Sequence, residues 1–255
     1  MLKATLRAML RDRVRRHRGR QLDRGVVRFG RASLKCGLLP LHLRYLLTKY
    51  EVDCVIDVGA NRGQFAGMLR SRVDYRGPIL SFEPGSAAFR ALQGLAARER
   101  DIHPHRLGLG ARADTLALNV MELDVLASFL APVQSEIEIT QNRVVGTEEV
   151  PVRRLDDLTG EIPLLARSRR MLLKIDTQGF DLQVLAGAEG LLDRVVAVLV
   201  ETPFARIYDG APSYVEVFDA LRAKGFHPSA FAASGIHKDR IIDVDALFVN
   251  AAFAR

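Results

Sequence analysis

Short apolar runs alternate with helical patterns of apolar residues over most of the chain. The runs that predict β-strands are 54–58, 78–82, 171–175, 195–200 and 246–249. Between them, apolar residues recur at spacings of three and four, as on one face of a helix, around 65–69, 89–95 and 184–192. Strands that alternate with helices predict an α/β fold with a mostly parallel sheet.

The last helix carries the clearest boundary signals. Ser213 is followed three residues later by Glu216, which is the spacing of a capping box, and Gly225 is a typical helix stop. The middle of the chain, 103–160, is broken repeatedly by Gly and Pro. There, 116–120 and 150–155 are candidates for extra strands with a loop between them.

The N-terminal part differs from the rest in charge. The chain has 255 residues and a net charge of +7, but residues 1–50 alone carry 14 Lys and Arg against two acids, so the remainder is acidic. Residues 1–24 show a basic amphipathic helix pattern, and 38–47 predict a short helix ending near Tyr50. We therefore divide the chain into a basic helical extension, 1–49, and a main domain, 50–255.

Two interpretations of the basic segment 1–24 remain open. It either contacts anionic lipid headgroups at a membrane surface or packs on its own domain or a partner protein. No apolar run reaches the length of a membrane span, and no secretory signal is recognisable. With only two cysteines, a disulfide scaffold is excluded, and we expect a cytoplasmic protein, peripheral at the inner membrane surface under the first interpretation.

The segment 55–65 joins the first predicted strand to the first predicted helix. Gly59 would allow a ligand to approach the backbone, Asn61 tolerates a positive φ, and Gly63 allows close packing of helix and strand. Free N–H groups at a helix start favour a carboxylate or phosphate, whereas Asp57 favours a ligand with a positive charge. The spacing matches neither a dinucleotide fingerprint nor a nucleoside triphosphate loop, so a simple tight turn is the alternative.

A second acid follows the next predicted strand. Glu83 lies 26 residues after Asp57, near the interval at which α/β nucleotide sites place an acid that accepts from ribose hydroxyls. Pro84 stops the strand and fixes Glu83 at its carboxyl end. A solvated turn residue is the alternative interpretation of Glu83.

Three motifs occur in a fixed order: Asp-Val-Gly-Ala-Asn-Arg-Gly at 57–63, Phe-Glu-Pro at 82–84 and Leu-Lys-Ile-Asp-Thr-Gln-Gly at 173–179. With these motifs the chain resembles the FkbM family of class I S-adenosylmethionine-dependent methyltransferases, over about 50–250. The resemblance implies a Rossmann-like, seven-stranded, mostly parallel sheet with helices on both faces. It also implies S-adenosylmethionine as cofactor and methylation of a hydroxyl on a small molecule, a sugar or glycolipid, or a polyketide. Contact of residues 1–24 with anionic lipid would place the enzyme beside a lipid-linked acceptor.

The resemblance also assigns roles to residues. The residues Gly59, Ala60, Asn61 and Gly63 would cradle the methionine part of the cofactor near Asp57, and Glu83, followed by Pro84, would bind the ribose. Asp176 would lie by the transferred methyl group, with Glu201 lining the acceptor side.

For the chemistry, a carboxylate within hydrogen-bond reach can take the proton of the acceptor hydroxyl, and Asp176 is the first choice. The alternative for Asp176 is a structural acid at the start of the next helix. Glu201 either orients the acceptor, helps Asp176 hold a divalent cation or is structural, and two carboxylates are too few to assign a metal. Tyr208 is a candidate wall of the acceptor pocket, with ordinary packing as the alternative.

Two other function classes fit the sequence less well. An RNA or DNA methyltransferase of the same fold would need a basic face with stacking aromatics, but residues 51–255 are acidic overall and the chain has no Trp. A non-catalytic protein that binds a ligand and docks at a membrane is less consistent with three acids at strand ends. The identity of the acceptor and the oligomeric state cannot be inferred from the sequence.

Overall fold

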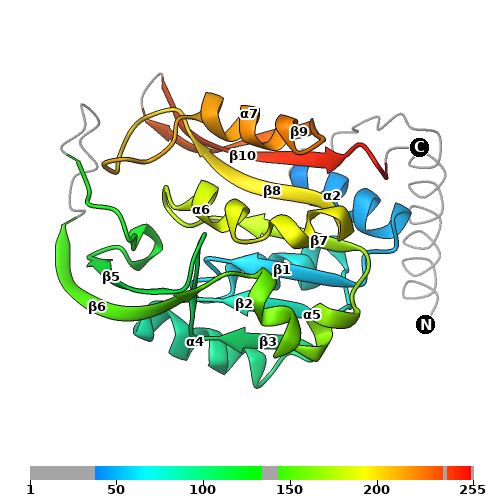
Figure 1. Ribbon diagram of the computed structural model, residues 1–255, viewed down its shortest axis with the longest axis horizontal. Helices are drawn as coiled ribbons and strands as arrows, with labels where there is room; N and C mark the ends of the chain where they lie inside the picture. The colour runs from blue at the N-terminus through cyan, green and yellow to red at the C-terminus, as the bar shows by residue number, and fades with distance from the viewer. Residues whose placement is uncertain (1–37, 134–142, 238–239, 254–255) are drawn as a thin grey trace, which may run out of the picture.

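The computed structural model describes residues 38–133, 143–237 and 240–253. Their central element is a seven-stranded sheet with the order β3-β2-β1-β7-β8-β10-β9, in which all neighbours are parallel except at β10 (Figure 1). Its strands are β1 Cys54–Val58, β2 Ile79–Phe82, β3 Ile102–His105, β7 Met171–Ile175, β8 Val195–Pro203, β9 Phe226–His237 and β10 Arg240–Asn250. The predicted fold class, a seven-stranded, mostly parallel sheet with helices, is confirmed.

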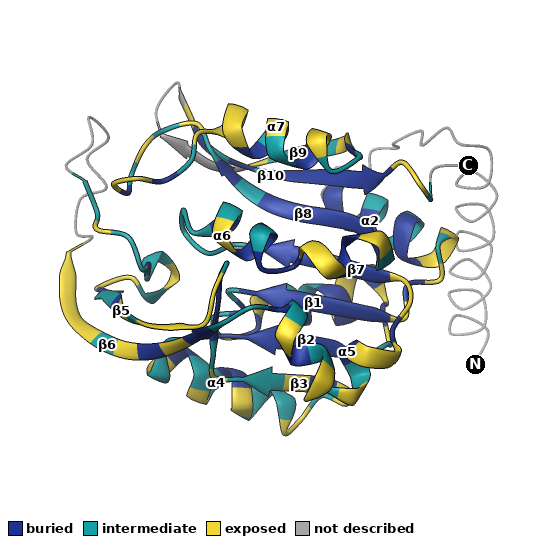
Figure 2. Cartoon of the chain, viewed as in Figure 1, coloured by how far each residue is buried: buried dark blue, intermediate teal, exposed yellow. Residues whose placement is uncertain are grey.

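Helices cover both faces of this sheet. One core lies between the sheet and α5 (Pro163–Arg167), α6 (Asp181–Ala186) and α7 (Tyr214–Ala223). The other lies under α2 (Leu38–Lys49), α3 (Gln64–Met68) and α4 (Ser86–Ala96). A π-helical turn (Leu69–Val73) continues α3, and 3₁₀ turns occupy Asp124–Leu126, Asp156–Gly160 and Glu189–Arg194. The central strands are buried along their length, as expected of a sheet that is covered on both sides (Figure 2).

The strand order reverses direction at β1, which has β2 on one side and β7 on the other. In open α/β sheets, ligands bind outside the carboxyl ends of the strands at such a reversal. The segments that follow β1, β2 and β7 meet there, so the three motifs found in the sequence converge on one end of the sheet.

A separate three-stranded sheet stands beside these strand ends (Figure 1). Its strands are β4 (Gly108–Leu109), β5 (Asp114–Met121) and β6 (Val144–Arg153). The two extra strands expected at 116–120 and 150–155 are therefore present, but they pair with each other and with β4 rather than joining the main sheet.

Strands β8 and β9 are among those that differ from the sequence-based expectation. β8 runs to Pro203, so Glu201 lies within the strand and not after it, because β10 pairs alongside and places Asp245 opposite Glu201. β9 was not predicted, since Pro228, Gly235 and three alanines lower its strand propensity; it is an edge strand held by β10.

The capping box at Ser213 and Glu216 is confirmed, and Gly225 follows α7 with a φ of +82°. Helix α2, which the sequence-based division places in the extension, buries Leu43 and Leu46 in the second core. The predicted basic helix at 1–24 lies outside the described residues. Within the described parts, no helix is both long and apolar enough to cross a membrane.

Candidate functional site

The turn after β1 begins with Gly59 and leads into α3. Gly59 has a φ of +73°, and a Cβ atom there would lie 1.8 Å from the carbonyl oxygen of Asp176. Asn61 has a φ of +46°, as expected for a residue that tolerates the left-handed region. At Gly63, with a φ of +87°, a Cβ would meet the side chains of Leu92 and Leu95. Gly63 thus permits close contact with α4, whereas the sequence predicted close contact with a strand.

Glu83 joins the ends of β1 and β2. Its side chain is buried, and its two carboxylate oxygens accept from the backbone N–H groups of Asn61 (2.7 Å) and Gly85 (2.8 Å). Burial raises the pKa of Glu83 to about 7, and these two hydrogen bonds oppose the rise. Glu83 therefore lies on the cavity side of the turn with lone pairs still free to accept from a ligand.

Asp57 is fully buried beneath the turn. Its Oδ1 lies 3.1 Å from Nζ of Lys174, the residue directly beside it on β7. Asp57 does not line the cavity. Burial raises the pKa of Asp57, and the ammonium of Lys174 opposes the rise. Burial alone would lower the pKa of Lys174, but its two neighbouring carboxylates, Asp57 and Asp176, raise it, so the ammonium stays charged.

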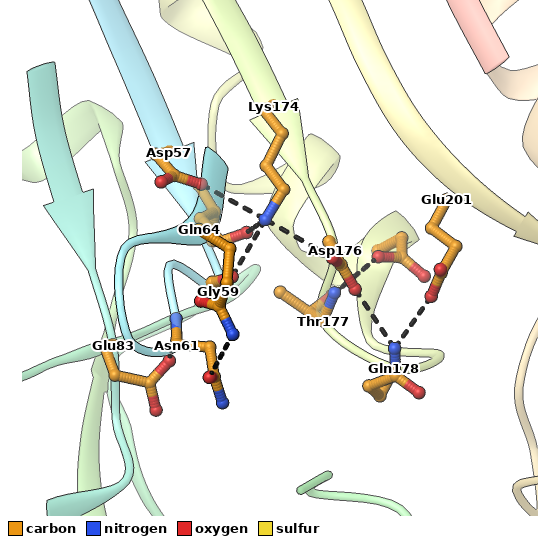
Figure 3. A network of polar contacts seen from close by, with 12 residues as sticks. Asp57, Gly59, Asn61, Gln64, Glu83, Lys174, Asp176, Thr177, Gln178 and Glu201 are labelled. Carbon is orange, nitrogen blue, oxygen red and sulfur yellow. Dashed lines mark hydrogen bonds and ion pairs between the residues drawn. The ribbon is translucent and has the colours of Figure 1, made fainter. Parts of the chain in front are cut away.

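Asp176 follows β7 and is held from two sides (Figure 3). Its Oδ2 lies 3.4 Å from Nζ of Lys174, and its Oδ1 accepts from Nε2 of Gln178 (3.1 Å). The same nitrogen of Gln178 donates to Oε2 of Glu201 (2.7 Å). The hydroxyl of Tyr208 lies 3.1 Å from Oε1 of Gln178 and 2.8 Å from the carbonyl oxygen of Leu126. Gln178 therefore connects the two candidate catalytic acids.

Glu201 lies in a cluster of acidic side chains. Burial and then the charges of Asp176, Asp243, Asp181 and Asp245 raise its pKa well above its usual range, so Glu201 carries a proton at neutral pH. Burial raises the pKa of Asp245, on the neighbouring strand, to about 6. At neutral pH Glu201 thus acts as a neutral hydrogen-bonding group.

A cavity of about 350 Å³ opens over the turn after β1. Glu83, Lys174, Asp176 and Asp245 are among its charged groups, and Gly59, Ala60, Asn61 and Pro84 supply its nearest backbone. Its other lining residues are Leu39, Gln64, Phe65, Met68, Leu118, Asp124, Val125, Ala127, Phe129, Thr177, Gln178 and Leu199. A smaller cavity beside it contains Gln178, Glu201 and Tyr208 in its wall.

The segment around Asp124 closes one side of the cavity. The guanidinium of Arg62 lies 2.6 Å from Oδ2 of Asp124, and Nδ2 of Asn61 donates to the carbonyl oxygen of Asp124 (3.3 Å). The turn after β1 thus holds in place a segment that is distant from it in the sequence.

The structure brings most of the candidate residues to one place. Gly59, Ala60, Asn61, Glu83, Pro84 and Asp176 all line the same cavity. Gly63 and Asp57 lie behind its wall, and Glu201 reaches the cavity only through Gln178. The roles assigned to these residues remain predictions.

Three residues of the site were not among the predicted functional residues: Lys174, Gln178 and Asp245. Lys174 had a readable signal, because a lysine inside an apolar strand needs a counterion and Asp57 occupies a similar position in the first strand. Gln178 had none, since its role depends on the course of the loop after β7. Asp245 belongs to a strand whose start was not recognised.

One interpretation of the sequence was that Asp176 and Glu201 together hold a divalent cation. In the structure, the side-chain nitrogen of Gln178, a hydrogen-bond donor, bridges the two acids. In the part of the chain that the structure describes, no three His, Cys, Asp or Glu side chains are grouped so as to hold a metal ion. The arrangement of these two acids is therefore explained by hydrogen bonding.

Two curated methyltransferases are similar to this chain in sequence. "Methyltransferase 1" of Beauveria bassiana is 28% identical over 188 residues, 68% of this chain and 71% of that protein. "Hexuronic acid methyltransferase AglP" of Haloferax volcanii is 27% identical over 161 residues, 62% of this chain and 60% of that protein.

The solved structure of a methyltransferase FkbM from Methylobacillus flagellatus shares the fold. Its TM-score is 0.51 at 15% identity, with 78% of this chain and 44% of that chain covered. The model of the methyltransferase FkbM domain matches residues 57–228, which include the turn after β1, Glu83, Asp176 and Glu201. The chain belongs to the FkbM methyltransferase family.

Proposed function

We propose that this protein transfers a methyl group from S-adenosylmethionine to a hydroxyl oxygen of a small molecule, with sugars as the first class to test. The observation that carries the proposal is the convergence of Glu83 and Asp176 on one cavity over the turn after β1. Membership of the FkbM methyltransferase family supports methyl transfer as the reaction, and the cavity supports the end of the sheet beside β1 as its location.

The residues around the cavity fit the cofactor. Glu83 keeps lone pairs free beside its two backbone hydrogen bonds, which suits the paired hydroxyls of a ribose. Leu118 and Phe129 offer apolar surface for a base, and Asp245 supplies negative charge for the positive groups of the ligand. When bound, the cofactor supplies a methyl group on a positively charged sulfur.

Asp176 is the group of this chain that would accept the proton of the acceptor hydroxyl. Its side chain is about one-third exposed to the cavity, and Lys174 and Gln178 fix its two oxygens. A carboxylate held in this way meets the need for a positioned base. Much of the remaining rate enhancement would come from alignment of the two reactants within the cavity.

Glu201 would help to orient the acceptor through Gln178, which lines the cavity, and would not take the proton. Because its raised pKa keeps it protonated, its hydroxyl can donate a hydrogen bond, while Oε2 accepts from Gln178. We therefore divide the two candidate catalytic acids into a proton acceptor, Asp176, and a neutral positioning group, Glu201.

The choice of oxygen and of sugars rests on two supports. The candidate base is a carboxylate, which suits a hydroxyl acceptor, and one relative is named for methylation of a hexuronic acid. On these two grounds we propose a sugar hydroxyl as the acceptor of this chain.

The test is a transfer assay with radiolabelled S-adenosylmethionine and a panel of defined acceptors: methyl hexosides, hexuronates, polyols and a short RNA. We expect label on a sugar hydroxyl, located by mass spectrometry and NMR of the product. Label on the RNA, or on a nitrogen or carbon atom of any acceptor, would contradict the proposal.

A further inference from the structure

Lys174 lies between the turn after β1 and Asp176, the candidate base, and contacts both. It lies inside β7, in the row of side chains that faces α2 and α3, and its side chain is only 9% exposed. Its Nζ donates to the carbonyl oxygen of Gly59 (2.8 Å) and lies 3.1 Å from Oδ1 of Asp57 and 3.4 Å from Oδ2 of Asp176. Figure 3 shows these three contacts diverging from one nitrogen.

An ammonium has three N–H donors. Here four acceptors on two segments of chain surround it, because the carbonyl oxygen of Val58 also lies 3.5 Å from Nζ. Asp57 and Gly59 belong to β1 and its turn, whereas Asp176 follows β7. A buried lysine needs one counterion, and Asp57 alone would supply it. The contacts with Gly59 and Asp176 are therefore additional to charge neutralisation, and they join the two halves of the site.

We propose that Lys174 is a positioning residue that fixes the turn after β1, through Gly59, in register with the carboxylate of Asp176. The turn presents its backbone to the cavity, and Asp176 lines the same cavity. One side chain thus sets the distance between the cofactor's cradle and the candidate base. This inference rests on the proposed function for the role of Asp176.

The competing explanation is that Lys174 only neutralises Asp57. A double-mutant cycle separates the two, because an asparagine in place of Asp57 needs no counterion. The four proteins are the wild type, Asp57→Asn, Lys174→Met and Asp57→Asn/Lys174→Met. Methionine is similar in length to lysine but has no donor. For each protein we would measure the thermal midpoint and the calorimetric Kd for S-adenosylmethionine.

The thermal midpoint reports how far Lys174 neutralises the buried charge of Asp57. Lys174→Met leaves Asp57 buried without a counterion and should lower the midpoint by about 10 °C, and Asp57→Asn in the same chain should restore most of it. The Kd for S-adenosylmethionine reports how far Lys174 positions the turn after β1. We expect Lys174→Met to weaken S-adenosylmethionine binding by about tenfold, both in the wild-type background and in the Asp57→Asn background, which is the loss of one charge-assisted hydrogen bond.

If the double variant binds S-adenosylmethionine as well as Asp57→Asn does, Lys174 only neutralises Asp57 and the inference is overturned. If the methionine variants do not fold, Lys174→Arg replaces them, since it keeps the charge but changes the reach of the donors. An Arg variant with an unchanged Kd would overturn the inference in that case, and a weakened Kd at an unchanged midpoint would support it.

The contact with Asp176 has its own readout. Nε2 of Gln178 donates to Oδ1 of Asp176, so the side-chain amide resonance of Gln178 reports where that carboxylate lies. We expect this resonance to shift in the double variant relative to Asp57→Asn, and an unmoved resonance would remove Asp176 from the inference. Neither readout requires an acceptor. Normal turnover in Asp176→Asn would overturn the proposed function while the Kd cycle kept its result.

Discussion

Gly59 and Asp176 touch through their backbones: a single Cβ atom at Gly59 would lie 1.8 Å from the carbonyl oxygen of Asp176. The turn after β1 and the segment after β7 are therefore packed so closely that no side chain fits between them at Gly59. The site that contains the candidate base is built on this contact, and the left-handed φ of +73° at Gly59 adds a second requirement for glycine.

Gly59→Ala should accordingly damage both stability and cofactor binding. The new methyl group must push the two segments apart, so we expect a loss of at least about 2 kcal/mol in the free energy of unfolding and at least a tenfold higher Kd for S-adenosylmethionine. Chemical denaturation and calorimetry measure the two effects.

Gly67→Ala is the matched control for Gly59→Ala. Gly67 lies within α3, and a Cβ there would have no neighbour within 4 Å. Alanine should therefore raise stability by up to about 1 kcal/mol and leave the Kd unchanged. Equal behaviour of the two alanine variants would show that the contact between Gly59 and Asp176 has no importance.

Glu83 should make cofactor binding depend on pH. Because its pKa is about 7 in the ligand-free site, the ionised form that accepts from ribose hydroxyls is depleted as the pH falls from 8 to 6. We expect S-adenosylmethionine to bind up to about tenfold more weakly at pH 6 than at pH 8.

Glu83→Gln tests the origin of that pH dependence. The amide cannot ionise and accepts more weakly, so we expect at least about tenfold weaker binding at pH 8 and little further change at pH 6. Calorimetric titrations of both proteins at the two pH values provide the comparison. A Glu83→Gln variant that binds like the wild type at pH 8 would rule out the ribose assignment.

Glu201 should reduce stability at neutral pH. Its pKa is raised in the folded state, so the folded protein holds a proton that the unfolded chain has released above about pH 4.5. The wild type therefore loses stability relative to Glu201→Gln as the pH rises from 5 to 8, by about 1 kcal/mol per pH unit. Urea denaturation of both proteins across this range measures the difference in stability, which should become independent of pH below about pH 4.5.

Glu189→Gln is the control for that trend. The hydrogen bond from Lys224 lowers the pKa of the exposed Glu189, so its replacement cannot produce a gain that grows above pH 5. A gap between Glu201→Gln and the wild type that stays constant with pH would mean that Glu201 is ionised in the folded protein, and its role as a neutral group would be wrong.

Much of this site was readable from the sequence because its residues follow apolar strands. Carboxyl ends of parallel strands meet at one edge, so Asp57, Glu83 and Asp176 could be placed together before the structure was known. What the sequence could not show is which of them faces the cavity. Asp57 alternates into the core beside Lys174, a pairing that depends on the register between β1 and β7.

The same limit explains the residues that were missed. Gln178 joins Asp176 to Glu201 only because the loop after β7 folds back with a φ of +53° at that residue. Two strands of the second sheet were predicted but their pairing was not, since the contacts between β5 and β6 connect residues far apart in the chain. Local patterns carry no information on such contacts.

The basic segment 1–24 gives a prediction that rests on its composition. If it contacts anionic lipid, deletion of 1–24 should abolish co-sedimentation with vesicles rich in phosphatidylserine, because each basic residue near the surface contributes about 1 kcal/mol. Binding by the full chain should also weaken at high salt and be absent with neutral phosphatidylcholine vesicles. Unchanged co-sedimentation after the deletion would exclude this segment as the lipid contact.

The most direct measurement is the comparison of Asp176→Asn with the wild type, using an acceptor identified in the transfer assay. Asparagine keeps the shape of the side chain but cannot take a proton. We predict that turnover at saturating S-adenosylmethionine falls by about 100-fold or more, while the Kd for S-adenosylmethionine changes by less than about threefold. An Asp176→Asn variant that turns over at the wild-type rate would contradict the account.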